Sequence, residues 1–374
     1  MERSIGPNNP CWCGSKKRYK ECHENRSQQE QSTIEDFFKI AENQFQIRYC
    51  THPEASEKNC GRIANAHSIS KARGQKPISR DNHVYTFIPS QAKILHAAGA
   101  LTPPSLIGAN KISTFPGFCP HHDSSTFKPI DTQELNVSCQ HVFLLSYRSV
   151  CRELYAKEAH LDGLEKLRAF DAGKPFEAQV DFQNWIRKTK EYATKGLEEI
   201  KSLKQLYDTK LKEESYSSLN YYSICFKGVL PIACSSTGEF LYDAFKGTLQ
   251  EIDDISVDTE STSFHIIPVR DFTVAVFAAL GKCDVWKRLV DSLERVENTK
   301  VGDFLIKLPF FNFENLYASP VWWDSLKSGE KNYLLQLMQA MADPKTPVEP
   351  PSISDNFDLK TQWSLLSRSI FFAK

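Results

Sequence analysis

The spacing of hydrophobic residues predicts two helices in the middle of the chain. Between residues 141 and 159, and again from Phe176 to Leu211, apolar side chains recur at every third or fourth position, which is the period of a helix with one buried face. Lys190 and Lys204 interrupt the apolar stripe of the second helix. We therefore expect a long amphipathic arm that pairs with another helix, and not a strong coiled coil.

A different pattern governs residues 220–345. Short apolar runs separated by turn residues, "YYSICFKGVLPIACSS", "SFHIIPV" and "FTVAVFAAL", predict strands, whereas "VWKRLVDSLERV" and "SPVWWDSLKSGEKNYLLQLMQAM" have helical spacing. Trp322 and Trp323 stand near the start of the latter segment, where tryptophan is more often a core residue than a stacking platform. These features predict a separate α+β domain, whose role the sequence leaves open.

The whole chain is predicted to be an α+β protein made of five successive stretches. A small N-terminal zinc knot is followed by a treble-clef-like Cys/His unit, the long helical arm, the α+β domain, and a Pro-rich linker with a short apolar tail. Thr33 is the predicted N-cap of a short helix over residues 34–45, at the start of the second stretch. The predicted boundaries are 1–26, 34–140, 141–215, 220–345 and 346–374.

Charge and hydropathy then exclude several classes of partner. The chain has 46 basic and 46 acidic residues, so no whole-molecule field draws it to nucleic acid or to a membrane surface. It has no long uncharged apolar run of the kind that spans a membrane, and its first residues lack the apolar core of a signal peptide. We therefore expect a cytoplasmic protein without a membrane partner, where clustered cysteines favour metal binding over disulfides.

The stretch "PCWCGSKKRYKECHE", residues 10–24, contains a complete set of zinc ligands. The predicted ligands are Cys11, Cys13, Cys22 and His23. Three thiolates and one imidazole form the Cys₃His set of a closed tetrahedral site, and Gly14 permits the tight turn between the two ligand pairs. Because so short a segment has no apolar core of its own, metal binding would supply its folding free energy.

This stretch resembles the SEC-C zinc-binding motif, which is appended to many unrelated bacterial proteins. The matching positions are Cys11, Cys13, Gly14, Ser15, Lys17, Tyr19, Lys20, Cys22 and His23. Lys16 departs from the motif, which usually has a glycine there. The resemblance implies a bacterial protein with an accessory docking module for a protein partner or the ribosome. The basic residues around the site could meet an acidic partner or RNA, or form only a solvated face.

A second set of cysteines and histidines lies between residues 50 and 122. The predicted ligands are Cys50, Cys60, Cys119 and His122. The first pair flanks a loop, and the second pair has the spacing that lets two side chains at the start of a helix hold one metal ion. The four would complete a treble-clef zinc site, although the loop is long for a knuckle and His52 or His121 could replace a ligand. Two zinc ions per chain are therefore predicted.

Residues 50–131 also resemble the HNH, or ββα-metal, nucleases. The resemblance rests on "NAHSIS" as one strand, "DNHVYTF" as the strand that returns beside it, and a helix that opens at "CPHHD". It implies that His67 is the general base that activates water and that Asn82 orients it. His121, together with His122 or Asp123, would then bind a catalytic Mg²⁺ or Mn²⁺.

Two functions follow from these patterns, and the sequence leaves both open. The first is a zinc-stabilised binding or adaptor protein for protein or nucleic acid, in which His67 is a structural core histidine. The alternative is a metal-dependent endonuclease acting on DNA or RNA, with Arg148 and Arg152 of the next helix in contact with phosphates. Whether the chain is an enzyme depends on which of the two is right.

Overall fold

The chain folds into two compact units in its computed structural model. One unit combines residues Met1–Ile47 with Ala156–Glu198, and the other combines Arg48–Tyr155 with Glu199–Lys374; we call them the knot unit and the sheet unit. The structure describes residues 5–33, 35–36, 47–70, 75–87, 101–109, 111–252, 254–269, 271–342, 349–355, 359 and 363–373. The predicted helix over residues 34–45 lies outside the described residues, apart from Glu35 and Asp36.

The knot unit consists of the N-terminal Cys/His knot and a helical hairpin. Its elements are η1 (Tyr19–Glu21), η2 (Arg26–Gln28), the C-terminal part of α4 (Cys139–Leu167), η6 (Arg168–Asp171) and the N-terminal part of α5 (Phe176–Lys212). Leu164, Leu167 and Ile186 are buried between the two helices. Ile186 belongs to the predicted apolar stripe, whereas Leu164 and Leu167 lie where α4 continues beyond its predicted end at residue 159. The remaining turns of α4 and α5 belong to the sheet unit.

The turn of the hairpin depends on Gly173. This residue has φ +73°, and a Cβ added to it would lie 2.7 Å from Cα of Gln31 and 2.8 Å from the carbonyl oxygen of Gln29. Its N–H donates a hydrogen bond of 3.0 Å to the carbonyl of Arg26. Only glycine therefore lets the segment that follows the knot lie directly on the turn between the helices.

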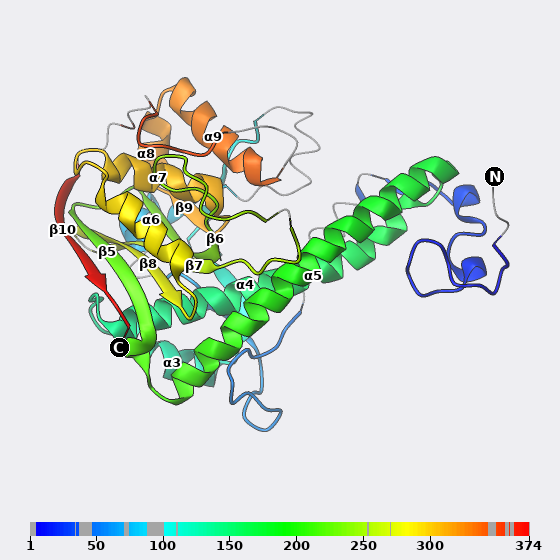
Figure 1. Cartoon of the computed structure of the whole chain (residues 1–374), viewed down its shortest axis with the longest axis horizontal. Coiled ribbons are helices and arrows are strands. Elements are labelled where there is room, and N and C mark those ends of the chain that lie inside the picture. Colours follow the sequence, from blue (N-terminus) through cyan, green and yellow to red (C-terminus); the bar gives the residue numbers. More distant parts are fainter. Residues whose placement is uncertain are drawn as a thin grey trace. The chain divides into compact units, whose positions relative to one another are not determined.

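The sheet unit is built on an antiparallel eight-stranded sheet with the order β10-β5-β8-β7-β6-β9-β2-β3 (Figure 1). Its strands are β2 (His83–Thr86), β3 (Ser105–Gly108), β5 (Leu219–Lys227), β6 (Ile232–Glu239), β7 (Ser261–Val269), β8 (Phe272–Leu280), β9 (Leu316–Ala318) and β10 (Ser364–Phe371). Its other elements are β1 (Ala64–His67), η5 (Lys76–Ile78), β4 (Thr114–Phe118), α3 (Pro120–Thr132), η7 (Tyr216–Ser218), α6 (Asp284–Glu294), α7 (Val301–Asn312), α8 (Pro320–Ser325) and α9 (Ser328–Ala342). The predicted α+β class is confirmed.

The two faces of the large sheet differ in polarity. One face carries apolar side chains that form the main core with α6, α7 and α9, where the indole N–H of Trp286 donates to the carbonyl of Phe277 at 3.0 Å. The other face presents hydroxyl groups and a histidine to α4, as in the 2.6 Å contact between the hydroxyls of Ser149 and Thr237. Because side chains alternate along a strand, a mixed run such as "STSFHIIPV" supplies both faces at once.

The structure corrects the predicted pairing around His67. Strand β1 pairs with β4, and not with residues 82–87. The latter form β2, which pairs with β3 on one side and with β9 on the other. The physical reason is burial: Val84 and Thr86 of β2 are buried, and the large sheet offers them a far larger apolar surface than the short β1.

The tail of the chain also differs from its predicted form. Within residues 346–374, predicted as a linker and tail, Ser364–Phe371 form the edge strand β10 beside β5. The compact units therefore follow other boundaries than the five predicted stretches, since residues 48–140 and 220–345 lie in one unit. Among the helices of the described residues, none combines the length and the apolar character that a membrane span requires.

Candidate metal centres

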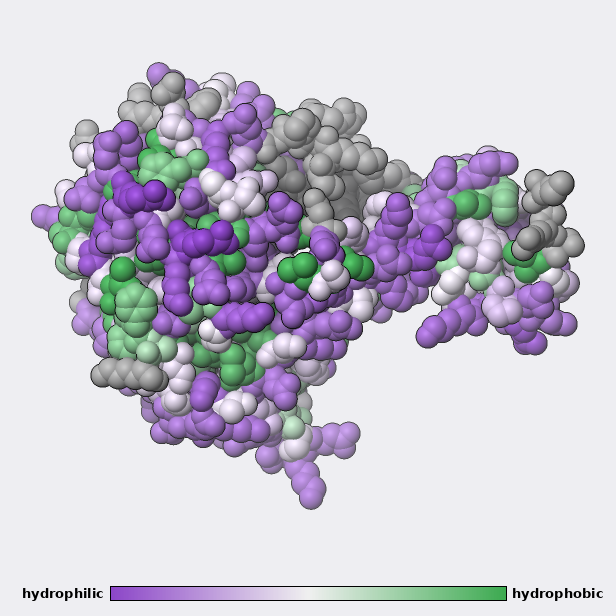
Figure 2. All heavy atoms as spheres, viewed as in Figure 1, coloured by the Kyte–Doolittle hydropathy of each residue, from purple (hydrophilic) through white to green (hydrophobic). Residues whose placement is uncertain are grey.

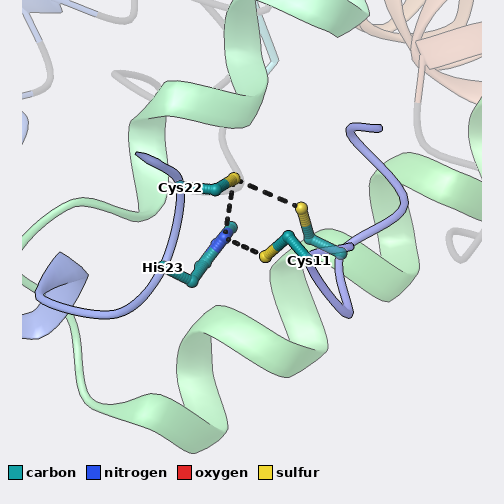
Figure 3. A group of neighbouring side chains, drawn as sticks. Cys11, Cys22 and His23 are labelled. Carbon is teal, nitrogen blue, oxygen red and sulfur yellow. Dashed lines mark hydrogen bonds between the residues drawn. The ribbon is translucent and has the colours of Figure 1, made fainter. Parts of the chain in front are cut away.

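The N-terminal knot brings four ligand atoms together. They belong to Cys11, Cys13, Cys22 and His23. The Nδ1 atom of His23 lies 3.2 Å from Sγ of Cys11 and 3.1 Å from Sγ of Cys22, and the Sγ atoms of Cys13 and Cys22 are 3.6 Å apart. Ordinary zinc bond lengths give tetrahedron edges of about 3.6 Å between N and S and about 3.8 Å between two S atoms. The side chains of Cys11, Cys22 and His23 point toward one another in Figure 3, and the four ligand atoms together fit a closed Cys₃His site.

Local backbone geometry explains how so short a segment converges on one point. Gly14 has φ +78° and Lys16 has φ 62°, so the chain turns twice through the left-handed region between the ligand pairs. The N–H of Cys11 donates to the carbonyl of Lys17 at 2.9 Å. The amides of Cys22 and His23 both donate to the carbonyl of Tyr19, at 3.0 and 2.9 Å. The second ligand pair is therefore held by one helical turn.

The thiols of this knot need a cation to ionise together. Burial raises the pKa of Cys11 to about 12. Burial also acts to raise the pKa of Cys13, but hydrogen bonds from His23 and Ser15 outweigh it and lower that pKa to about 6. Thiolates packed this closely repel one another, and a divalent ion removes that repulsion. Sulfur and imidazole ligands favour zinc over the oxygen-preferring Mg²⁺ or Mn²⁺.

A buried carboxylate of the hairpin turn orients the histidine of the knot. The Nε2 atom of His23 lies 3.0 Å from Oδ2 of Asp171, which is fully buried. Asp171 also accepts hydrogen bonds from Arg26 at 2.8 Å and Gln183 at 2.7 Å. Although burial opposes it, these three partners hold the pKa of Asp171 below its usual value. Such a carboxylate fixes the ring so that Nδ1 faces the metal.

Packing against the helices completes the knot unit. The ring of Trp12 lies 4.6 Å from that of His23 and 5.6 Å, edge to face, from that of Phe176 at the start of α5. Arg168 donates to the carbonyl of Cys13 at 3.0 Å and to the side chain of Gln183 at 2.9 Å. The knot is therefore attached to the turn of the helical hairpin by aromatic and polar contacts.

The sheet unit contains a second group of the same composition. Its ligand atoms belong to Cys50, Cys60, Cys119 and His122. The Nδ1 atom of His122 lies 3.4 Å from Sγ of Cys50, 3.4 Å from Sγ of Cys60 and 3.3 Å from Sγ of Cys119. These distances again match the edges of a zinc tetrahedron. The structure thus brings together both predicted sets of four residues.

Two segments far apart in the sequence build this second group, the loop with Cys50 and Cys60 and the junction of β4 and α3 with Cys119 and His122. Strand β4 leads directly into Cys119, the N-cap of α3, whose Sγ accepts the N–H of His122 at 3.4 Å. The loop from Cys50 lies beside β4, because the N–H and the hydroxyl of Thr51 both donate to the carbonyl of Gly117 at 2.8 Å. A loop, an antiparallel strand pair and a helix therefore follow one another, as in a treble clef.

Helix α5 supports this loop from the other side. Lys204, which is 5% exposed, donates to the carbonyl of Thr51 at 2.8 Å and to Asp208 at 2.5 Å. The hydroxyl of Tyr147 in α4 donates to the same carboxylate at 2.9 Å. A buried lysine that is paired in this way fixes the residue next to the ligand Cys50. Lys204, which interrupts the apolar stripe of α5, is thus explained by the metal centre.

The residues predicted for nuclease chemistry do not form a ligand group in the described part of the chain. His67 ends β1 opposite Thr114 and is half-buried. Asn82 is exposed, with φ 58°, in the turn before β2, and His121 is exposed on the first turn of α3. Neither His67 nor His121 belongs to any group of metal-binding atoms found among the described residues.

The residues predicted to bind a cation or a phosphate pair with other side chains of the chain itself. Arg148 is 2% exposed and makes two hydrogen bonds to Asp131, of 3.0 and 2.6 Å. Asp123 lies 3.7 Å from the same guanidinium, which also covers the ring of Phe127 at 3.9 Å. An arginine that is buried between two carboxylates is a structural group, and the prediction that Arg148 contacts phosphate is wrong. Arg152 is half-buried on α4.

His52 lies beside the second group without completing it. Its ring stacks on that of His122, with centroids 4.1 Å apart and planes 8° from parallel. His52, Glu54 and His122 can be grouped as potential ligands, but Nδ1 of His52 already accepts the N–H of Glu54 at 3.2 Å. His52 therefore acts as a cover for the ligand ring, and it does not replace one of the four ligands.

Two closed Cys/His centres define the class of protein. With four protein ligands each, they have no open coordination position, as in structural zinc sites and unlike catalytic ones. Residues 8–25 match the family model of the SEC-C motif. The SEC-C motif and the two clusters together support a zinc-binding protein. Neither a curated protein nor a solved structure matches the chain, and nothing in the match or the strand pairing supports the resemblance to HNH nucleases.

Sequence reasoning missed the residues that hold the ligands in place. Asp171 lies in "RAFDAGKP", a polar turn between two helices, and its role appears only when the knot lies on that turn. Lys204 gave a signal, as a charge within an apolar stripe, but the signal could equally mark the end of a packing interface. Asp171 contacts a ligand 148 positions away, and Lys204 contacts Thr51, the neighbour of a ligand, 153 positions away.

Proposed function

We propose that this chain is a zinc-stabilised binding protein whose SEC-C knot docks an acidic protein partner. The observation that carries the proposal is the exposed basic loop of the knot. Lys16, Lys17, Arg18 and Lys20 are all exposed between the two ligand pairs. Zinc binding would fold this loop, and the knot that contains it packs against the turn of the helical hairpin.

The charges of this loop are available for a partner. Arg18 forms an ion pair with Glu21 at 2.5 Å, whereas Lys16, Lys17 and Lys20 have no ion pair recorded among the described residues. A loop whose backbone is held by a metal loses little backbone entropy on binding, so three lysines presented side by side favour an acidic surface of matching size. The proposed contact is therefore small and electrostatic.

An acidic protein suits this patch better than nucleic acid does. Nucleic-acid binders that contact many phosphates need an extended basic surface, and the chain balances 46 basic with 46 acidic residues. Three free lysines in one loop are enough for a carboxylate cluster on a protein. The resemblance of the knot to SEC-C motifs, which imply docking to proteins or ribosomes, supports the same class of partner.

The test is charge reversal with a matched control. The variant Lys16→Glu, Lys17→Glu, Lys20→Glu and the control Lys111→Glu, Lys227→Glu, Lys282→Glu change the net charge equally at exposed positions. Partners cross-linked in cells would be compared by quantitative mass spectrometry, with and without ribonuclease. We expect the knot variant to lose at least about tenfold of a specific protein partner while both variants keep their zinc. Equal recovery by both variants would refute the proposal, and a partner lost on ribonuclease treatment would indicate RNA.

A further inference from the structure

The edge strand β10 presents an open row of backbone groups. Among the described residues it pairs with β5 on one side and with no strand on the other, and it is the first strand in the order of the eight-stranded sheet. The register is regular from Ser367 to Phe371, after an irregularity between Leu365 and Ser367. Because alternate residues of an antiparallel edge direct N–H and C=O away from the sheet, about half of this strand has free hydrogen-bonding groups.

The opposite edge of the sheet is protected, and β10 is not. Strand β3 at that edge has only four residues, and Pro103 and Pro104 precede it. Short length and nearby proline are devices that prevent strand addition. Strand β10 has eight residues and contains neither proline nor lysine.

The one charge in β10 is already engaged. Arg368 donates to the carbonyls of Leu293 and Val296 at the end of α6, at 2.8 and 2.7 Å, and to the side chain of Asn298 at 2.9 Å. Its guanidinium therefore neutralises the C-terminal end of a helix and does not guard the edge. No free charge on the strand opposes the approach of another strand.

Apolar side chains line the same edge. Leu366 is 49% exposed, Ile370 is 38% exposed, and Phe372, which follows the strand, is 59% exposed. Figure 2 shows apolar surface near the end of the chain that Figure 1 marks as the C-terminus. Exposed apolar groups beside open backbone groups on one edge are typical of a site for strand pairing.

We propose that β10 pairs with the β10 strand of a second copy of this chain. Every pairing within the sheet is antiparallel, and a strand that pairs antiparallel with its own copy forms a two-fold symmetric interface. A charged partner finds no complementary charge at this edge, whereas a copy brings the same uncharged apolar side chains. The interface is small, so the dissociation constant is on the order of 10 µM. A dimer of this kind carries two SEC-C knots, which strengthens binding to a partner that offers two sites.

The experiment measures association as a function of concentration. Sedimentation velocity between about 1 and about 200 µM is expected to show a monomer that becomes a dimer. Hydrogen exchange at both ends of this range locates the interface, and the amides of Ser367–Phe371 are expected to gain protection at the higher concentration. The variant Leu366→Lys, Ile370→Lys should weaken the dimer by at least about tenfold, because lysine on an edge blocks strand addition.

The control is a pair of equal substitutions away from β10. Leu106 of β3 and Val321 of α8 are 54% and 59% exposed, and Leu106→Lys, Val321→Lys should leave dimerisation unchanged. A monomer at about 200 µM, a dimer that survives the β10 substitutions, or protection that rises only elsewhere would each overturn the proposal. If the β10 variant fails to fold, hydrogen exchange of the unaltered protein decides by itself.

Discussion

The two Cys/His centres have the same four ligand types and are built in opposite ways. The ligands of the first lie within residues 11–23, whereas those of the second come from two distant segments, residues 50–60 and residues 119–122. The first centre is a local knot without an apolar core of its own. The second joins a loop to strand β4 and to helix α3 within a large unit. The same four ligand types can therefore fold a small module or connect distant segments of a large unit.

Each centre nevertheless depends on one buried charged residue from the helical hairpin or arm. Asp171 orients His23 of the knot, and Lys204 holds the loop that carries Cys50. Helix α5 thus contributes to both centres, through Gln183 beside Asp171 and through Lys204. This shared dependence separates the ligands, which bind the metal, from the residues that set how tightly it is held.

The largest expected effect is on the sheet unit when its metal centre is broken. Cys119→Ser removes a ligand at the start of α3, and since zinc binding joins two distant segments, the sheet unit should lose roughly 5 kcal/mol of stability or more. Urea unfolding followed by circular dichroism measures this loss. Cys225→Ser, at a half-buried cysteine outside both centres, is the control and should cost far less. Equal losses would mean that the second centre does not fasten the unit.

The next effect concerns the support of the knot. Asp171→Asn removes the negative charge that faces His23, Arg26 and Gln183, so zinc affinity of the knot should fall by about 10- to 100-fold. Competition with a chelator, followed by native mass spectrometry, measures the change for each centre. Asp162→Asn in the same unit, where the carboxylate pairs with Lys166 at 40% exposure of its own side chain, should change nothing. An unaltered affinity in the Asp171 variant would leave the hairpin without a role in metal binding.

A smaller effect comes from His265, a buried histidine of the sheet that makes the unit sensitive to acid independently of the metal ligands. Burial lowers the pKa of His265 from 6.5 to about 3, and the ring contacts Ser235 at 2.9 Å and Ser146 at 3.3 Å. Because only the unfolded chain takes up this proton between those values, the stability is present above pH 6.5 and is lost as pH falls toward 3. Between about pH 7 and about pH 5.5, the free energy of unfolding should therefore fall by about 1 kcal/mol less in His265→Gln than in the unaltered protein. Equal losses of unfolding free energy in the two proteins between these pH values would contradict this assignment.

The smallest expected effect concerns the backbone conformation of Lys16 in the knot. Lys16 has φ 62°, a conformation that costs a lysine more than a glycine. Lys16→Gly should stabilise the zinc-bound knot by about 0.5 kcal/mol, close to a twofold gain in zinc affinity. Lys17→Gly, at a position without positive φ, should weaken it slightly. If both variants weaken zinc binding, the side chain of Lys16 supports the knot directly.

How much the sequence could predict depended on the distance between interacting residues. The knot was fully predictable because its ligands lie within one short segment, and the helices α4 and α5 were predictable from their period. The ligands of the second centre could be paired by spacing, but the partner of β1 could not be predicted, since His67 and Thr114 are joined by a long insertion that contributes β2 and β3 to another sheet. Strand β10 was missed because its exposed edge has no alternation to detect.

The zinc content of the chain shows whether it holds two closed metal centres. Native mass spectrometry of the intact chain and of Cys22→Ser, combined with circular dichroism, reports how many ions are bound and whether the sheet unit remains folded. We expect two zinc ions in the unaltered protein, and one in Cys22→Ser with the sheet unit intact. Fewer than two zinc ions in the unaltered protein, or the loss of both ions from Cys22→Ser, would contradict two independent closed centres.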